Sequence, residues 1–334
     1  MRLFVYEHIT GGGRLDAPLP EGLLAEALLM LRALVADLRE CSGIEAIGLR
    51  DHRVDPGALP DDWAAVCSRQ HWQASVDDMI RSSDATWPTA PETGGVLEEI
   101  ARRVMRAGKL LIGSRPDAVH IAASKFATAR ALERAGVAAV PTFRPDDRPA
   151  PAGQRWIVKP DDGCGCEDVR LFEGLRAAVR WLQSCGDAHR YVLQPYLQGE
   201  PLSLSALARD GRAVLLSVNR QDIALHDGGL RYCGCMVNSL PDTGGRFLHL
   251  AQSVVDAIPG LDGYFGVDLV MTSDGPSVVD VNPRLTTSYA GLRAGLGINA
   301  ARMALSRSGE ASAGVRGRPV VVSLAHQRCT AAGR

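Results

Sequence analysis

The chain has 334 residues, 46% of them hydrophobic, and a formal net charge of −1 at pH 7. This length can bury the cores of two or three lobes, and the near-neutral charge excludes a general attraction to nucleic acid or to an anionic membrane. No stretch reaches the roughly 18 apolar residues of a membrane span, and no signal-peptide pattern precedes the first apolar run. Eight cysteines without secretory features favour a cytoplasmic protein with reduced thiols.

The first hundred residues alternate short apolar runs with amphipathic stretches, which is typical of a parallel sheet covered by helices. We expect a helix at 21–40 and strands at 3–6, 44–49, 63–67 and 109–112. The Gly-Ser-Arg-Pro turn at 113–116 marks the expected end of this lobe, at about residue 115. The class of fold predicted for the first lobe is therefore α/β.

The rest of the chain contains fewer helical patterns and more strand patterns. Ser124 is a suitable N-cap for a helix that runs to residue 135, and the proline-rich segment 141–151 indicates a loop. Further elements are expected as a helix at 175–184 and strands at 156–159, 169–172, 191–194, 213–218, 264–271 and 277–281. After residue 306 we expect a loose tail with one short apolar run at 320–324.

Lysine is rare in this chain: Lys109, Lys125 and Lys159 are the only lysines among 37 basic residues. A scarce lysine indicates a place where a compact ammonium fits and a planar guanidinium does not. Lys125 opens the predicted helix, and Lys159 ends a strand just before a loop with Gly163 and Gly165. Such a loop lets backbone N–H groups approach phosphate oxygens closely, although a hairpin turn with an exposed lysine remains an alternative. The P-loop pattern does not occur in the chain.

A set of oxygen-bearing side chains lies near the ends of two later strands. Asp280 and Asn282 are two residues apart and share one strand face, and Asp268 can join them from a neighbouring strand. These are the ligand types that Mg²⁺ takes beside nucleotide phosphates, and Arg284 would add positive charge there. Polar strand ends are the structural alternative, but burying Asp280 among valines without a partner would be costly.

The segment 191–200 begins as an apolar strand and turns at Pro195. Its backbone can offer hydrogen bonds to an adenine edge, and Glu200 can reach ribose hydroxyls. A strand followed by a turn explains the segment equally well when it is taken alone.

In this order, the elements between about residues 113 and 290 resemble the ATP-grasp superfamily of carboxylate–amine ligases. The resemblance implies an ATP-grasp fold with an N-terminal parallel-sheet lobe (1–115), a central lid lobe (116–197), a C-terminal α+β lobe (198–306) and a tail (307–334). It implies that Lys125 and Lys159 bind ATP phosphates together with the glycine loop. The adenine frame implied by the family consists of Gln194, Pro195 and Leu197. The implied ligands of two Mg²⁺ ions, replaceable by Mn²⁺, are Asp268, Asp280 and Asn282.

Two positions depart from the pattern of the superfamily. Gln194 stands where many relatives have glutamate, but its amide oxygen can still accept a bond from the adenine amino group. Glu200 follows Gly199 directly, whereas some relatives insert a residue, which leaves its ribose role open.

A narrower resemblance rests on residues 5–8 with the glycines at 11–13, on 218–221, and on 282–289. These segments look like the tyramine–glutamate ligase group, which makes the γ-glutamyl core of methanofuran-type (methylofuran) one-carbon carriers. The resemblance implies an amide made from glutamate and an aromatic amine, tyramine or tyrosine, through glutamyl phosphate, with Lys159 and Arg284 neutralising charge and residues 163–165 closing as a lid. A ligase for another amino acid or peptide, or a non-catalytic ATP-binding regulator, remains open, as does a homodimer.

Four cysteines offer a rival interpretation as a zinc site. They form two C-x-C pairs, Cys164 with Cys166 and Cys233 with Cys235. The usual zinc spacing is C-x₂₋₄-C, so we do not expect zinc here.

Overall fold

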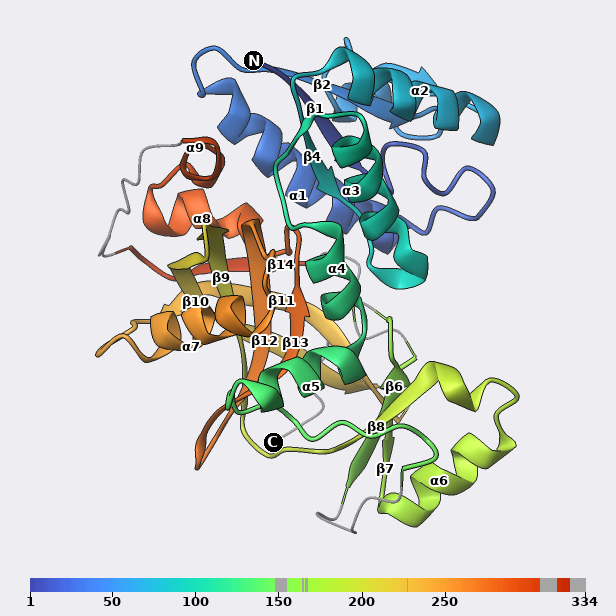
Figure 1. Cartoon of the computed structure of the whole chain (residues 1–334), viewed down its shortest axis with the longest axis vertical. Coiled ribbons are helices and arrows are strands. Elements are labelled where there is room, and N and C mark those ends of the chain that lie inside the picture. Colours follow the sequence, from blue (N-terminus) through green and yellow to red (C-terminus); the bar gives the residue numbers. More distant parts are fainter. Residues whose placement is uncertain (148–154, 164, 166–167, 227, 307–316, 325–334) are drawn as a thin grey trace.

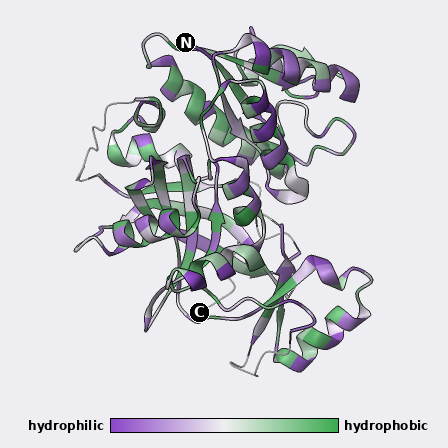
Figure 2. Ribbon diagram, viewed as in Figure 1, coloured by the Kyte–Doolittle hydropathy of each residue, from purple (hydrophilic) through white to green (hydrophobic). Residues whose placement is uncertain are grey.

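The computed structural model describes residues 1–147, 155–163, 165, 168–226, 228–306 and 317–324. Their strands form three sheets, which belong to three lobes arranged along the long axis of the molecule (Figure 1). Several of the covering helices show hydrophobic and hydrophilic stretches in alternation, as expected for helices with one buried face (Figure 2). No helix within these ranges is long and apolar enough to cross a membrane.

The N-terminal lobe contains a parallel five-stranded sheet with the order β3-β2-β1-β4-β5. Its strands are β1 (Arg2–Glu7), β2 (Glu45–Asp51), β3 (Ala64–Val66), β4 (Ala85–Thr89) and β5 (Leu110–Leu111). Its helices are α1 (Glu21–Arg39), α2 (Arg69–Ser82) and α3 (Val96–Arg106), with short 3₁₀ turns η1 (Pro56–Ala58) and η2 (Thr93–Gly95).

Helices cover both faces of this sheet. Because successive side chains of a strand point to opposite sides, each strand contributes to two hydrophobic clusters. Leu3 and Val5 of β1 pack with α1, whereas Phe4 and Tyr6 pack with α2 and α3. The structure therefore confirms the predicted parallel α/β lobe. Strand β4, which contains Pro88, was not predicted from the sequence, although all five of its residues are buried.

The central lobe is small and antiparallel. Its elements are β6 (Trp156–Pro160), β7 (Arg170–Phe172), α6 (Leu175–Ser184), η3 (Ala188–Arg190) and β8 (Tyr191–Pro195), with the sheet order β7-β6-β8. Trp156, Val158 and Leu193 of the sheet pack with Ala178 and Leu182 of α6. Helix α6 thus covers one face of the sheet, and the other face is left for the cavity described below.

The C-terminal lobe contains a six-stranded antiparallel sheet with the order β13-β12-β9-β10-β11-β14. Its strands are β9 (Glu200–Arg209), β10 (Arg212–His226), β11 (Gly229–Leu240), β12 (Gly263–Thr272), β13 (Gly275–Asn282) and β14 (Val320–Ser323). Its helices are α7 (Arg246–Ala257), α8 (Tyr289–Leu296) and α9 (Ala300–Leu305). The structure confirms the strands expected near 213–218, 264–271 and 277–281 and adds β9 and β11.

Two findings differ from the expected division of the chain. Helix α5 (Lys125–Arg134), predicted from the sequence and expected within the lid lobe, packs on the C-terminal sheet together with helix α4 (Pro116–Ala123), which was not predicted; Ala118, Ala122 and Leu132 join the hydrophobic core of that sheet. Within the expected loose tail, β14 pairs antiparallel with β11, which is an otherwise open sheet edge.

The N-terminal and C-terminal lobes are joined by polar contacts of helix α1. Asp37 accepts hydrogen bonds from the Tyr289 hydroxyl at 2.8 Å and from Arg293 Nε at 2.9 Å. Asp37 is buried, and these partners compensate the cost of removing its charge from water. The contact fixes α1 relative to the end of the large sheet, which matters because α1 also contributes to the cavity.

Candidate active site

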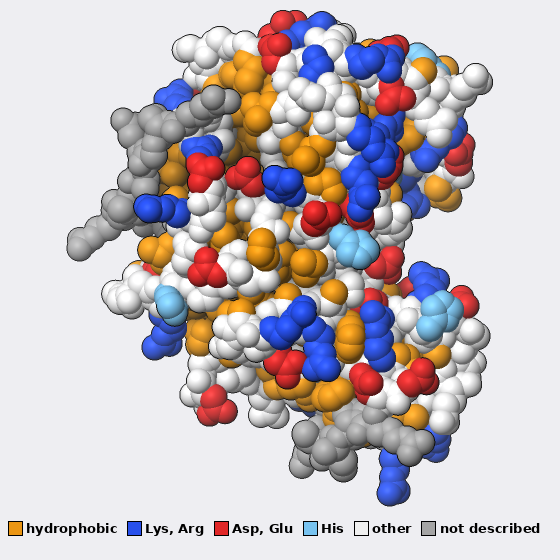
Figure 3. Space-filling model, in the orientation of Figure 1, with side chains coloured by type: hydrophobic (Ala, Val, Ile, Leu, Met, Phe, Trp, Pro, Cys, Tyr) orange, Lys and Arg blue, Asp and Glu red, His pale blue; other side chains and the backbone are white. Residues whose placement is uncertain are grey.

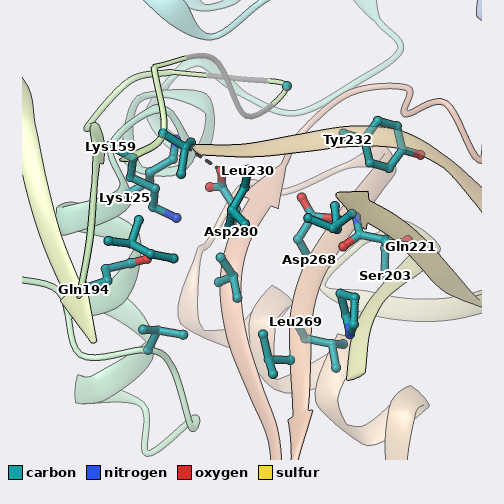
Figure 4. Close-up of a pocket in the computed structure, with 18 of the residues that line it drawn as sticks. Lys125, Lys159, Gln194, Ser203, Gln221, Leu230, Tyr232, Asp268, Leu269 and Asp280 are labelled. Carbon is teal, nitrogen blue, oxygen red and sulfur yellow. Dashed lines mark hydrogen bonds and ion pairs between the residues drawn. The ribbon is translucent and has the colours of Figure 1, made fainter. Parts of the chain in front are cut away.

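A cavity of about 430 Å³ lies between the small sheet of the central lobe and the large sheet of the C-terminal lobe. We call its two ends the lysine end, which comprises Lys125, Lys159 and Gln194, and the Glu26 end, which comprises Glu26, Tyr232 and Thr287. Figure 4 shows the lysine end facing Tyr232 and Gln221 across the cavity, with Asp280 and Asp268 between them. The surface in Figure 3 is indented between the N-terminal and central lobes and carries charges of both signs.

Lys125 connects the start of α5 to both sheets. Ser124 caps the helix by accepting from Ala127 N at 3.0 Å, and its hydroxyl donates to Asp161 at the end of β6. Lys125 is 7% exposed; its Nζ donates to the Gly163 carbonyl and forms an ion pair with Asp280 at 3.2 Å. The sequence prediction that Lys125 opens a helix is confirmed, and the structure adds that this helix starts beside the glycine loop.

Lys159 lies on the penultimate position of β6, buried to 7% exposure, and lines the same cavity. Gly163 and Gly165 also line it, and Gly165 has a φ of 64°, a conformation that L side chains rarely adopt. Two ammonium groups and a glycine-bearing loop therefore lie together, although the rest of the loop at 164 and 166–167 falls outside the described residues. This arrangement favours a phosphorylated ligand.

Gln194 of β8 is 3% exposed, and the direction of its amide follows from its neighbour. The Thr142 hydroxyl donates to the Val140 carbonyl at 2.9 Å, so it is an acceptor toward Gln194 Nε2 at 2.8 Å. Because this bond fixes the side of Nε2, the amide oxygen of Gln194 is oriented away from Thr142 and can accept a hydrogen bond from a ligand. Pro195 and Leu197 line the cavity beside it.

Asp268 and Asp280 are paired directly across strands β12 and β13. Asp268 accepts from Gln221 Nε2 at 2.8 Å and from Asn282 Nδ2 at 3.0 Å. Burial, followed by the nearby charge of Asp280, raises the pKa of Asp268 to about 6 against the two hydrogen bonds, which lower it. Two carboxylates that face each other across paired strands form a site that a cation would stabilise.

This donor set fits Mg²⁺, which prefers hard oxygen ligands. Asp268 and Asp280 supply carboxylate oxygens and Asn282 an amide oxygen, and all three line the cavity. Across the described part of the chain, no three His, Cys, Asp or Glu side chains form a metal-binding group. A magnesium ion here would therefore take its remaining ligands from phosphate oxygens or water, as is usual for magnesium at nucleotides.

Arg284 and Glu200 have partners that the sequence did not indicate. Arg284 lines the cavity, and its Nε lies 3.0 Å from Glu92 of the N-terminal lobe; both side chains are largely buried. Glu200 forms an ion pair with Arg220 and is not among the residues that line the cavity. Its ribose role remains a prediction that the geometry does not favour.

Several cavity residues had no assigned role from the sequence. Gln221 belongs to a segment noted for its resemblance, but its bond to Asp268 depends on strand pairing around a β-bulge. Glu26, Tyr232 and Thr287 come from a helix, a strand and a loop that only the tertiary fold brings together. Thr287 lies in the segment 282–289 that carries the narrower resemblance, but no role was assigned to it; Glu26, within an amphipathic helix, and Tyr232 carried no signal.

Of the four cysteines that we do not expect to bind zinc, the structure describes two. Cys164 and Cys166 lie outside the described residues, while Cys233 and Cys235 are buried on β11. Cys233 is disulfide-bonded, so the expectation that the cysteines are all reduced is wrong at this position. Cys235 is a free thiol, and burial raises its pKa to about 11, which disfavours the thiolate form that binds metals.

The central lobe, the two buried lysines and the paired carboxylates Asp268 and Asp280, which we call the carboxylate edge, form a cavity suited to a nucleotide with Mg²⁺. A family model described as ATP-grasp domain matches residues 122–288, and one described as pre ATP-grasp 3 domain matches residues 44–119. The chain belongs to the ATP-grasp superfamily of ATP-dependent carboxylate–amine ligases.

Its similarity to known proteins agrees with this class. Tyramine–L-glutamate ligase of Methanocaldococcus jannaschii is 28% identical over 61% of this chain and 56% of its own length. The enzyme of the same name from Methanocaldococcus fervens is 23% identical over 87% of this chain and 89% of its own length. A crystal structure of an ATP-grasp superfamily protein from Archaeoglobus fulgidus has a TM-score of 0.71 and 21% identity, over 97% of this chain and 99% of the other. At that identity the structural likeness shows the fold alone.

Proposed function

We propose that the chain joins L-glutamate to an aromatic amine, tyramine or tyrosine, through its γ-carboxylate, with ATP as the source of energy. The observation that carries this proposal is the single cavity in which the lysine end, the Asp268–Asp280 edge and a second polar end are continuous. The names of the two archaeal relatives support the choice of substrates. By the same resemblance, the product would belong to the synthesis of a methanofuran-type one-carbon carrier.

In this proposal the lysine end binds the nucleotide. The amide oxygen of Gln194, oriented by Thr142, accepts a hydrogen bond from the adenine amino group. Lys125 and Lys159 place their ammonium groups against the phosphates; both are already buried, so little side-chain freedom remains to be lost on binding. Pro195 and Leu197, which follow Gln194 and line the cavity, would lie against the base.

Asp268, Asp280 and Asn282 would hold Mg²⁺, and we propose two ions, with Mn²⁺ as a substitute. Bound Mg²⁺ supplies positive charge to the phosphate oxygens. The ammonium group of Lys125 lies 3.2 Å from the Asp280 carboxylate and compensates its charge before a ligand enters. Gln221 and Asn282 hold the Asp268 carboxylate in place from two sides.

The proposed reaction has two steps, a phosphoryl transfer and then an acyl transfer. A γ-carboxylate oxygen of glutamate attacks the γ-phosphorus of ATP, the bond to the bridging oxygen breaks, and ADP leaves. The amine nitrogen then attacks the acyl carbon of glutamyl phosphate, loses a proton, and inorganic phosphate leaves with the carbon–oxygen electron pair. Lys159 and Arg284 contribute by positioning and charge neutralisation, which account for most of phosphoryl-transfer catalysis.

The test is ADP release by the purified protein with ATP, Mg²⁺, L-glutamate and, separately, tyramine, tyrosine or dopamine. We expect ADP and inorganic phosphate to form only when glutamate and an amine are both present, and the product to be a γ-glutamyl amide by mass spectrometry. AMP and pyrophosphate would contradict the acyl-phosphate route. Turnover with other amino acids alone would point to a different ligase, and tight ATP binding without any turnover to a regulatory protein.

A further inference from the structure

The Glu26 end of the cavity is formed by helix α1, strand β11 and the loop before α8, which supply Glu26, Tyr232 and Thr287. Glu26 projects from α1 and accepts a hydrogen bond from the Thr287 hydroxyl at 2.5 Å. Tyr232 of β11 lies beside Thr287 and Cys235; burial raises its pKa well above the usual value, and it stays a neutral hydroxyl. The Glu26 end therefore offers one carboxylate and two hydroxyl groups to a ligand.

This end is continuous with the carboxylate edge where the reaction is proposed. Gln221, which donates to Asp268 at 2.8 Å, is paired across strands with Cys235, and Ile223 is paired with Tyr232. Gln221, Ile223 and Tyr232 all line the same cavity. A small molecule can thus extend from Asp268 to Glu26 without leaving the cavity.

The charges of the cavity distinguish Glu26 from the other acidic side chains. The acidic residues that line it are Glu26, Asp268 and Asp280, and the basic ones are Lys125, Arg155, Lys159 and Arg284. Asp280 has Lys125 as its ion-pair partner, and Arg284 has Glu92. In the part of the chain that the structure describes, Glu26 has a neutral hydroxyl as its partner and no Lys or Arg ion pair. A half-buried carboxylate in such surroundings favours a cationic ligand.

The nucleotide cannot be that ligand, because its phosphates are negative and its proposed contacts lie at the lysine end. Both other proposed substrates carry a primary ammonium group. Resting on the proposed function, we propose that Glu26, held in place by Thr287, binds the ammonium group of an amine-bearing substrate at the end of the cavity opposite the lysines. The ammonium has two sources, the α-amino group of glutamate and the amine that becomes acylated.

The two sources make different demands on Glu26. If it binds the α-ammonium of glutamate, the γ-carboxylate is directed away from Glu26 toward Asp268. If it binds the second amine, the carboxylate is also placed to accept the proton that the nitrogen must lose before attack. Thr287 then acts as a positioning residue in both cases.

The experiment compares Glu26→Gln with Glu40→Gln, the same change at the exposed C-cap residue of the same helix, which lies outside the cavity. KM is measured separately for ATP, L-glutamate and tyramine. We expect KM for one ammonium substrate to rise about ten- to a hundredfold in Glu26→Gln, as for loss of a hydrogen bond between charged groups. KM for ATP should stay at the wild-type value, and Glu40→Gln should match the wild type throughout. Glu26→Asp, which keeps the charge, should recover part of the loss.

A substrate analogue separates the two sources. Glutarate lacks the α-ammonium but keeps the carboxylates. If Glu26 binds glutamate, the wild type and Glu26→Gln should use glutarate equally poorly; if it binds the amine, the increase in KM should fall on tyramine, with either carboxylate donor. Equal KM values for both ammonium substrates in Glu26→Gln and Glu40→Gln would overturn the proposal.

Calorimetry distinguishes a failure of the Glu26 proposal from a failure of the proposed function. If the wild type releases no ADP with glutamate and any amine, the substrate assignment is wrong, but binding can still be titrated. Wild-type protein is then titrated with L-glutamate, glutarate, tyramine and 4-ethylphenol, which is tyramine without its amino group. Binding of an amine-bearing compound that is lost in Glu26→Gln supports the ammonium site, and the same binding in both proteins, or none in the wild type, contradicts it.

Discussion

The two ends of the cavity are assembled from the chain in different ways. The lysine end takes Lys125, Lys159 and Gln194 from one stretch of the chain, each at the start or end of a local element. The Glu26 end takes its residues from α1, β11 and the loop before α8, which are separated by up to 261 residues in sequence. A nucleotide is recognised by helix starts, strand ends and glycines, so that end has a local sequence pattern. The substrate end depends on how the lobes pack.

This difference assigns separate tasks to the two ends. Changes at the lysine end and the carboxylate edge should affect every reaction the protein performs, because ATP is used in each. Changes at the Glu26 end should alter the choice of substrate while the use of ATP persists. The following predictions test this division, beginning with the largest effect.

Asp280→Asn and Asn282→Ala should lower turnover by about a hundredfold or more, the loss typical of removing one preorganised polar group at a reacting centre. Each change removes an oxygen ligand from the proposed magnesium edge while the strand remains paired. ADP release at saturating Mg²⁺ measures the effect, and circular dichroism checks the fold. Ser277, which is on the same strand and does not line the cavity, provides the control as Ser277→Ala. Wild-type turnover in either ligand variant would remove the metal assignment.

Lys159→Arg should reduce turnover nearly as much as Lys159→Ala, although it keeps the charge. Lys159 is 7% exposed, and a bulkier planar group must displace its neighbours or leave the phosphate position. Steady-state kinetics with varied ATP would show the loss in both kcat and KM, by about tenfold or more for a charged hydrogen bond. Normal kinetics in Lys159→Arg would show that the scarcity of lysine has no functional meaning.

The sequence predicted the elements whose signals are local and failed where the partner is distant. The helix start at Ser124, the strand that ends at Lys159 and the strand that holds Asp280 and Asn282 followed from capping, apolar runs and strand alternation. Arg284 was assigned to the phosphates, but its contact with Glu92 spans 192 residues and has no sequence signature.

Strand β14 illustrates the same limit for the fold. Val320–Ser323 was an apolar run in an apparent tail, because a strand is recognised only together with the edge that pairs with it. Similarly, α4 and α5 were placed with the lid by their position in the chain, whereas their small apolar residues match the C-terminal sheet. Pairing and packing partners are set by the whole fold, so neither could be derived from periodicity alone.

Glu92→Gln should lower kcat by about fivefold with smaller changes in KM, since a neutral amide holds Arg284 less firmly than a carboxylate does. Glu92 is on the turn before η2, in the lobe that also supplies Glu26, so this prediction tests whether that lobe positions the reacting centre. The matched control is Glu99→Gln, which removes an exposed carboxylate from α3. A kcat equal to that of the control would mean that Arg284 is placed by its own loop.

The smallest effect is expected for Thr142→Val, which keeps the shape of the side chain and removes the hydroxyl that fixes the Gln194 amide. Without that acceptor, Nε2 is free to turn toward the base, where it would face the adenine amino group with a second donor. KM for ATP should rise by about threefold, within the range for one neutral hydrogen bond, with kcat unchanged. ITP carries an oxygen in place of that amino group, so the preference for ATP over ITP should fall in the same proportion.

Thr272→Val, which removes a hydroxyl that donates to the Gly275 carbonyl in the β12–β13 turn, is the control. An unchanged ATP-to-ITP ratio in Thr142→Val would show that Gln194 does not read the adenine edge, and the lysine end would then lack the base specificity that its local pattern predicts.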